Sequence, residues 1–283
     1  MRITARRRAK RKGMAHPIGL AALSVLELTP PEMVSCAVDA GFDCVGLRLI
    51  PATRGEVQYP MVGDTPLVRE TERRLRDTGM RVLDIEIFRL RPDTVVADYE
   101  AALATGARLG ATEALIAGND PDEARLTASF AAFCELAQGF GIGGNLEPMP
   151  WTDCRNFAQG MRIVTAAGHE NGGILIDPIH FDRGGSSASE ISDVPHARFR
   201  YMQLCDAPAE RPTDTEGLLH QARAERLMPG DGGLDLTGIL RRVPSDLPIG
   251  LEIPMETLAR TVPAVERTRQ MLAKTRQLLA SLE

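Results

Sequence analysis

The chain has 283 residues, of which 43% are apolar and 25% are charged, a composition typical of a globular protein and not of a disordered or fibrous one. Its apolar runs, such as residues 18–26, are far shorter than the ~20 residues that a membrane helix needs. The net charge is −5, but seven basic residues stand within the first twelve positions, so the rest of the chain carries about −12. Such an acidic body is a poor electrostatic partner for nucleic acid. We therefore expect the chain to bind neither nucleic acid nor a membrane.

The basic residues belong to an N-terminal arm, residues 1–16, which we expect to be disordered and exclude from the fold. The alternatives are a tether for nucleic acid or membrane and the charged start of a signal peptide. Glu27 and the lack of a small-residue cleavage site weigh against the signal peptide, and Met14 is an alternative natural start. Five cysteines without a CxxC pair indicate reduced, mostly buried thiols in a cytoplasmic protein.

Short aliphatic runs alternate with longer amphipathic segments along the chain. The expected strands, in order, are 18–25, 44–50, 81–88, 113–117, 141–147, 173–177, 199–204 and 249–253. The expected helices are 30–40, 66–78, 93–109, 122–138, 153–167, a weak one near 187–191, 236–243 and 256–282, with a long irregular loop up to residue 232. Eight strand–helix units at this spacing predict a (β/α)8 TIM barrel, an α/β fold, as a single domain over residues 17–283. The alternative, a doubly wound open sheet, lacks the GxGxxG turn expected after its first strand.

Lysine usage narrows the possible chemistry. Outside the arm the chain has one lysine, Lys274, and no GxxxxGK[ST] motif occurs. Schiff-base chemistry and a phosphate-binding P-loop are therefore nearly excluded.

Four successive strands each end in a polar side chain, and these residues are Glu147, Asp177, Gln203 and Glu252. In a barrel, the C-terminal ends of the strands meet at the mouth of the active site. Three carboxylates in a low-dielectric cup raise one another's pKa unless a cation compensates. An oxygen-only ligand set favours one Mg²⁺ or Mn²⁺ ion over Zn²⁺. For any one of these acids alone, a helix N-cap or a salt-bridged rim residue is the alternative.

His180 follows Asp177 by three residues. It is a candidate acid–base group beside the metal, or a hydrogen-bond donor to a metal ligand. The alternative is a loop histidine whose ring is satisfied by a carbonyl group.

Several arginines are candidates for the mouth of the barrel. Arg223 lies in the long loop after the seventh strand and could bind a substrate anion, although a surface helix with ion pairs explains it equally well. Arg48 ends the second strand, and Glu86 lies on the third; both are further substrate-binding candidates. An anionic substrate is indicated if several arginines meet over the mouth, among Arg48, Arg54, Arg223 and Arg226.

With these motifs the chain resembles the sugar phosphate isomerase/epimerase superfamily of xylose isomerase-like barrels, from about Ile18 to the end. The superfamily includes ketose epimerases, inosose and 3-dehydroshikimate dehydratases, and metal-dependent endonucleases. The motifs that carry the resemblance are residues 145–148, 177–180, 203–206, 229–235 and 250–253. The resemblance implies one divalent metal held by the four strand-end residues, and a substrate contact for His180.

Two departures from the superfamily pattern bear on the activity. Ketose epimerases usually have a histidine where this chain has Gln203, and glutamine there resembles the dehydratase branch. The endonuclease branch uses additional histidines on early strands, where this chain has Arg48 and Glu86, and a DxH pair, which does not follow Gln203 here.

The resulting hypothesis is a metal-dependent isomerase or epimerase for a small sugar or polyol. Glu147 and Glu252 would act as opposed base and acid on the carbon next to a carbonyl, through an enediolate. Expulsion of a β-hydroxyl, assisted by His180, would instead give a dehydratase of the inosose or 3-dehydroshikimate type, which is the main alternative. A non-catalytic sugar-binding barrel and a metal-assisted phosphodiesterase are less favoured. The amphipathic segment 255–279 leaves a homo-oligomer possible.

Overall fold

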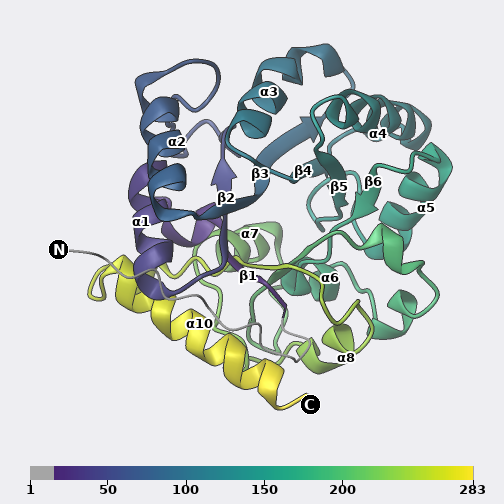
Figure 1. The fold of residues 1–283 in the computed structure, drawn as a ribbon. Helices are drawn as coiled ribbons and strands as arrows, with labels where there is room; N and C mark the ends of the chain where they lie inside the picture. The colour runs from purple at the N-terminus through teal and green to yellow at the C-terminus, as the bar shows by residue number, and fades with distance from the viewer. Residues whose placement is uncertain (1–15, 283) are drawn as a thin grey trace.

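Eight parallel strands curl around a common axis in the computed structural model, which describes residues 16–282 (Figure 1). The strands are β1 (Ile18–Leu20), β2 (Cys44–Arg48), β3 (Arg81–Leu90), β4 (Glu113–Gly118), β5 (Gly143–Glu147), β6 (Gly172–Ile174), β7 (Met202–Leu204) and β8 (Ile249–Leu251). They pair in the order β6-β5-β4-β3-β2-β1-β8-β7. The two ends of this order are joined where the Gln203 N–H donates to the Ile176 carbonyl at 3.0 Å. The predicted TIM barrel is confirmed.

Helices surround the strands on the outside of the barrel (Figure 1). They are α1 (Pro30–Ala40), α2 (Pro66–Thr78), α3 (Glu100–Arg108), α4 (Glu123–Gln138), α5 (Phe157–Ala167), α6 (Pro178–Arg183), α7 (Thr215–Arg223), α8 (Leu236–Leu240), α9 (Glu256–Ala259) and α10 (Ala264–Ala280). Short 3₁₀ turns lie at Ala22–Val25, Val96–Tyr99, Ala188–Ile191 and His196–Arg198. The C-terminal helix α10 packs against α1, next to the start of the barrel.

Local sequence explains why α1 begins and ends where predicted. Thr29 and Glu32 form a capping box, and prolines occupy the first helical turn, where no backbone N–H is needed. The helix ends at Gly41, whose φ of 94° is the left-handed conformation that glycine adopts without steric cost. The predicted bounds of α2 also agree with the structure, since Thr65 caps its first turn and Gly79 its last.

The inside of the barrel is unusually polar. Strands β2 and β3 pair with Gly46 opposite Asp84 and Arg48 opposite Glu86. The Tyr201 hydroxyl donates to Asp84 at 3.4 Å, which joins two strands that are not neighbours in the sheet. Some apolar side chains of the strands, such as Val45, are fully buried in the main hydrophobic core. Others, such as Leu83 and Leu115, belong to two separate clusters, and Leu115 lines the cavity.

Several predicted elements differ from the structure. The segment after the sixth strand contains α6, because Asp177 caps its first turn and Pro178 begins it. The loop expected up to residue 232 contains α7, so that prediction was wrong for nine residues. The helix predicted for 93–109 is a 3₁₀ turn followed by α3, and the one predicted for 153–167 begins only at Phe157. Pro263 separates α9 from α10 within the predicted helix 256–282.

The arm predicted for residues 1–16 lies, apart from His16, outside the described residues, and the domain boundary after it stays a prediction. All five cysteines are buried and free. Across residues 16–282, none of the helices has the length and the apolar character that spanning a membrane requires.

Candidate active site

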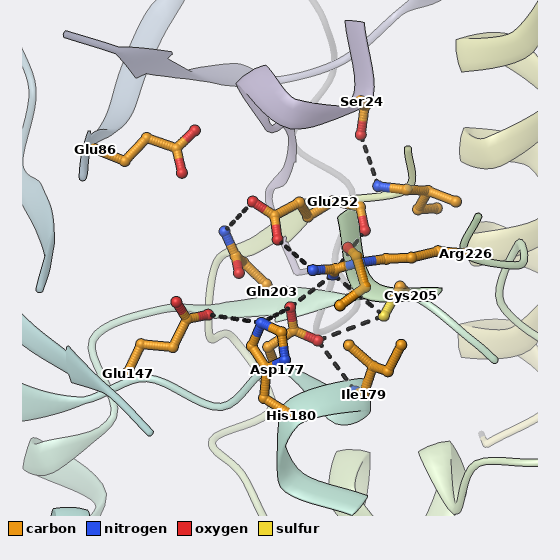
Figure 2. A network of polar contacts seen from close by, with 12 residues as sticks. Ser24, Glu86, Glu147, Asp177, Ile179, His180, Gln203, Cys205, Arg226 and Glu252 are labelled. Atoms are coloured by element: carbon orange, nitrogen blue, oxygen red, sulfur yellow. Dashed lines mark hydrogen bonds and ion pairs between the residues drawn. The ribbon is translucent and has the colours of Figure 1, made fainter. Parts of the chain in front are cut away.

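The four strand-end residues lie together inside one end of the barrel (Figure 2). Glu147 is the last residue of β5, and Glu252 directly follows β8. Gln203 lies within β7, and Asp177 is the N-cap of α6, where its carboxylate accepts the Ile179 N–H at 3.1 Å. All four are at most 4% exposed. The barrel therefore brings together, out of solvent, three acids and an amide that are up to 105 positions apart in the chain.

His180 lies in the same group, one turn into α6. Its Nε2 is 3.6 Å from Asp177 Oδ2 and 3.9 Å from Glu147 Oε1. One ligand atom from each of these three residues lies within 4.8 Å of the other two, a spacing compatible with a shared metal ion. Glu252 and Gln203 form the opposite side, with Gln203 Nε2 donating to Glu252 Oε1 at 3.0 Å.

A buried arginine, Arg226, lies between two of the acids (Figure 2). It forms ion pairs with Asp177 at 2.6 Å and with Glu252 at 2.8 Å. It also donates to the carbonyl groups of Ala222 and Glu252, at 2.6 Å and 3.0 Å. Sequence analysis considered Arg226 only as a residue over the mouth, whereas the structure makes it a fully engaged counter-charge within the group of acids.

Burial and mutual repulsion set the ionisation of the acids. Burial, together with the Glu252 and Asp177 charges, raises the pKa of Glu147 well above its usual value. Burial also raises the pKa of Glu252, to about 7, although Arg226 opposes this. Burial acts in the same direction on Asp177, but the charge and hydrogen bond of Arg226, together with His180 and the Cys205 thiol, outweigh it and leave the pKa of Asp177 below its usual value. Burial lowers the pKa of His180 to about 4, so its imidazole is neutral at pH 7.

Unpartnered atoms indicate what the group of acids lacks. Glu147 Oε1 and Gln203 Oε1 are buried acceptor oxygens with no hydrogen-bond donor among the described residues. Buried polar atoms are almost always paired with a hydrogen-bond partner. Two unpaired oxygens beside a carboxylate whose pKa is raised would therefore be stabilised by a nearby positive charge. The donor set, carboxylate and amide oxygens with an imidazole alongside, fits a divalent cation.

A cavity of about 380 Å³ opens onto these residues. Glu147, His180 and Glu252 line it, and so do the three predicted substrate-binding residues Arg48, Glu86 and Arg223. Asp177 and Gln203 are not among its lining residues. Arg48 is ion-paired with Glu56 at 2.6 Å and with Glu86 at 3.4 Å.

Among the residues of the cavity wall that sequence analysis missed, Arg89 and Trp151 carry groups that can bind a ligand. Arg89 lies near the end of β3, one residue beyond the predicted strand, and this position is a signal that could have identified it. Trp151 follows β5 by four residues, in a loop that carries no motif.

Comparison with known proteins places the chain among barrels of this kind. Residues 34–278 match the family model described as the xylose isomerase-like TIM barrel. The chain belongs to this family. The resemblance expected from the strand-end motifs is thereby confirmed.

One curated relative is a 3-dehydroshikimate dehydratase of Pseudomonas aeruginosa, 24% identical over 228 residues. The match covers 76% of this chain and 34% of the dehydratase, so the chain spans about a third of that relative's length.

Solved structures share the fold at low identity. A fusion of a xylose isomerase-like TIM barrel with a 4-hydroxyphenylpyruvate dioxygenase superposes with a TM-score of 0.76 at 22% identity, over 92% of this chain and 42% of that one. The IolI protein with a bound zinc atom superposes with a TM-score of 0.75 at 15% identity, over 94% of this chain and 99% of that one. A D-allulose 3-epimerase of Methylomonas sp. in complex with D-allulose superposes with a TM-score of 0.65 at 15% identity, over 93% of this chain and 96% of that one.

Proposed function

We propose that this protein is a divalent-metal-dependent enzyme that removes a proton from the carbon beside a carbonyl group of a small polyhydroxylated substrate. The observation that carries the proposal is the pair of buried oxygens without donors, Glu147 Oε1 and Gln203 Oε1, within a group of three carboxylates. A sugar-binding barrel without catalytic activity has no need of such a group.

The metal ion would be held by Glu147, Asp177, Gln203 and Glu252, with His180 close enough to be a further ligand. A divalent ion in this position supplies Lewis-acid stabilisation of the negative charge that develops on a carbonyl oxygen. The oxygen-rich donor set favours Mg²⁺ or Mn²⁺. The bound zinc in the IolI structure makes Zn²⁺ the ion to compare them with.

Among the two glutamates, Glu147 is the better base. Both oxygens of Glu252 already accept, one from Gln203 and one from Arg226. Glu147 lines the cavity, and neither of its carboxylate oxygens accepts a hydrogen bond from a described residue, so one can face the metal and the other the substrate proton. Its raised pKa brings its proton affinity nearer to neutral pH. Glu252, with a pKa of about 7, can hold a proton for return to the opposite face, which gives an epimer, or to the neighbouring carbon, which gives an isomer.

Dehydration is the second candidate, and specific observations favour it. The relative with the dehydratase name matches 76% of this chain, and glutamine at the ligand position of Gln203 resembles the dehydratase branch. In this reaction the same proton leaves the carbon next to the carbonyl, and the β-hydroxyl departs as water. Glu252, with a pKa of about 7, can supply the proton for the departing hydroxyl, while the neutral His180 imidazole can assist with a hydrogen bond. The substrate is a small molecule in either case. The cytoplasmic location of the protein and its assembly into a homo-oligomer remain predictions.

The test is hydrogen exchange in heavy water. Metal-replete protein incubated with ketoses and keto-cyclitols is expected to place solvent deuterium on a carbon beside the carbonyl, whichever product forms. Glu147→Gln should abolish this exchange while circular dichroism shows the fold intact, since general acid–base help is worth on the order of 10²–10⁴ in rate. Glu100→Gln, on the exposed start of α3, is the matched control. Exchange that persists in Glu147→Gln refutes the assignment of the base.

A further inference from the structure

Two arginines on the cavity wall have no acidic partner among the described residues. Arg89 and Arg223 both line the cavity. The Arg89 guanidinium group makes one hydrogen bond among the described residues, to the neutral Asn119 side chain at 3.0 Å. Arg223 lies over the Trp151 ring, with Cζ 5.7 Å from its centroid, and forms no ion pair with a described carboxylate. Both cations are therefore available to a ligand.

The other two arginines of the cavity wall already form ion pairs. Arg48 is paired with Glu56 and Glu86, and Arg226 with Asp177 and Glu252. The remaining lining carboxylates are Glu147, which the proposed function assigns to the metal, and Glu256, which is exposed at the start of α9. With a divalent ion beside Glu147, Arg89 and Arg223 are the lining cations that have no ion-pair partner among the described residues.

The surroundings of these two guanidinium groups disfavour their charged forms. Burial lowers the pKa of Arg89, and the nearby charges of Arg91 and Arg223 lower it further. Burial likewise lowers the pKa of Arg223; the Glu56 charge opposes this, and the Arg48 charge adds to it. Half-buried guanidinium groups that repel one another are stabilised when an anion accepts their hydrogen bonds.

Trp151 adds a third donor and fixes the position. Its indole Nε1–H is buried and has no acceptor among the described residues. The indole holds the Arg223 guanidinium on its face, a favourable cation–π contact. It also packs edge-on against His180, with ring centroids 4.9 Å apart. A group bound to Arg223 therefore lies one aromatic ring away from His180 and the acids.

We propose that the substrate carries an anionic group, which Arg89 and Arg223 bind, with Trp151 as a further donor, beside the group of acids. This inference rests on the proposed function, because it names the class of substrate for the same site. The planar guanidinium fork suits a carboxylate or a phosphate ester. A small hydroxylated acid or a sugar phosphate therefore fits the cavity better than a neutral ketose does.

Trp151 also provides the measurement, because it is the one tryptophan in the sequence. Its fluorescence is titrated in Mg²⁺-loaded protein with matched pairs: D-gluconate against D-glucitol, and quinate against myo-inositol. D-Glucitol 6-phosphate tests the phosphate arm. We expect at least one anion to bind tenfold or more tightly than its neutral counterpart. Tighter binding by gluconate or quinate identifies a carboxylate, and tighter binding by the phosphate ester identifies a phosphate.

Variants assign the effect to the two arginines. Arg89→Gln and Arg223→Gln should each weaken anion binding about 10-fold or more, the usual loss for a charged hydrogen bond, while binding of the neutral polyols is unchanged. Arg211→Gln, at an exposed position that does not line the cavity, is the matched control and should bind as the wild type does.

The outcomes separate this inference from the proposed function. The anion site is overturned if metal-loaded protein binds every anion no more tightly than its neutral counterpart. It is also overturned if both arginine variants bind the anions with full affinity. The proposed function survives either result if heavy-water exchange occurs with ketoses. Protein that binds the anions in an Arg89- and Arg223-dependent way, yet takes up no divalent metal, supports the anion site and overturns the proposed function.

Discussion

At the scale of single residues, the charge of the site is set by three buried carboxylates and one buried guanidinium. Arg226 neutralises about one of the three negative charges through its contacts with Asp177 and Glu252. The remaining charge of about −2 matches one divalent ion. This balance explains how so many acids are accommodated at positions at most 4% exposed.

Arg226→Met therefore has a defined expected effect. Removal of one partner of a buried ion pair leaves an uncompensated charge and costs about 3–5 kcal/mol. We expect this loss of unfolding free energy in urea titrations of metal-free protein, and a partial recovery when a divalent ion is added. Arg162→Met, which removes an exposed pair with Glu123, is the control and should cost under about 1 kcal/mol. An equally small cost for Arg226→Met would contradict the charge balance.

The strand-end acids and Arg226 differ in how readily sequence reveals them. Glu147 and Asp177 each end an aliphatic run just before a proline, so their position at the barrel mouth could be predicted. Arg226 stands in a stretch of alternating charges that is typical of an exposed helix. Its burial depends on contacts with residues 49 and 26 positions away, and no local pattern encodes these.

At the scale of elements, the loop between β2 and α2 covers part of the cavity. Ala52, Thr53, Gly55, Glu56 and Val57 all line it. Glu56 anchors this loop, because one carboxylate oxygen accepts from Arg48 at 2.6 Å and the other from the Ala52 N–H at 2.7 Å.

Glu56→Ala should release the loop. Loss of hydrogen bonds to a charged group costs about 1.5–3 kcal/mol, so local opening becomes roughly tenfold more frequent. Trypsin can report this opening at Arg54, which lies in the loop, and we expect faster cleavage there by mass spectrometry. Glu72→Ala, at an exposed pair with Arg108, is the control. Equal cleavage rates at Arg54 in the variant and the wild type would show that Glu56 does not hold the loop.

Elements with strong end signals were the ones that sequence predicted well. Threonine caps, first-turn prolines and left-handed glycines fix α1 and α2. The short helix α6 was missed because its six residues are too few for a helical period to emerge, and because its cap, Asp177, also served as a strand end in the prediction.

At the scale of the whole molecule, stability, metal binding and pH are linked through the raised pKa values. A buried acid whose pKa is raised on folding stabilises the protein below its unfolded pKa, and this contribution is lost as the pH rises through the folded value. For Glu252 that value is about 7, and the pKa of Glu147 is raised as well. The pKa of His180 is lowered to about 4, so its contribution to the stability of the protein is lost only as the pH falls below about 6.5. Above that pH this contribution changes little.

Metal-free protein should therefore lose stability between pH 6.5 and 8, while the increase in Tm on adding Mg²⁺ or Mn²⁺ grows over the same range. Ionisation of Glu252 alone strengthens metal binding about fourfold, or roughly 1 kcal/mol, which corresponds to ~2–4 °C for a chain of this size. Thermal melts with and without EDTA check this, with Glu252→Gln as the variant that should reduce the pH dependence and leave the contribution of Glu147. A metal-induced shift that is the same at both pH values would contradict the linkage.

Metal content per chain is the most direct test of the account. Elemental analysis of purified protein, after equilibration with Mg²⁺, Mn²⁺ and Zn²⁺ and removal of free ions, should find one divalent ion per chain. Glu147→Gln should bind less than a tenth of that amount, and Glu100→Gln should bind the full amount. A wild-type protein that retains no divalent ion, or a Glu147→Gln variant that retains a full one, would contradict the central claim that these strand-end residues form a metal site.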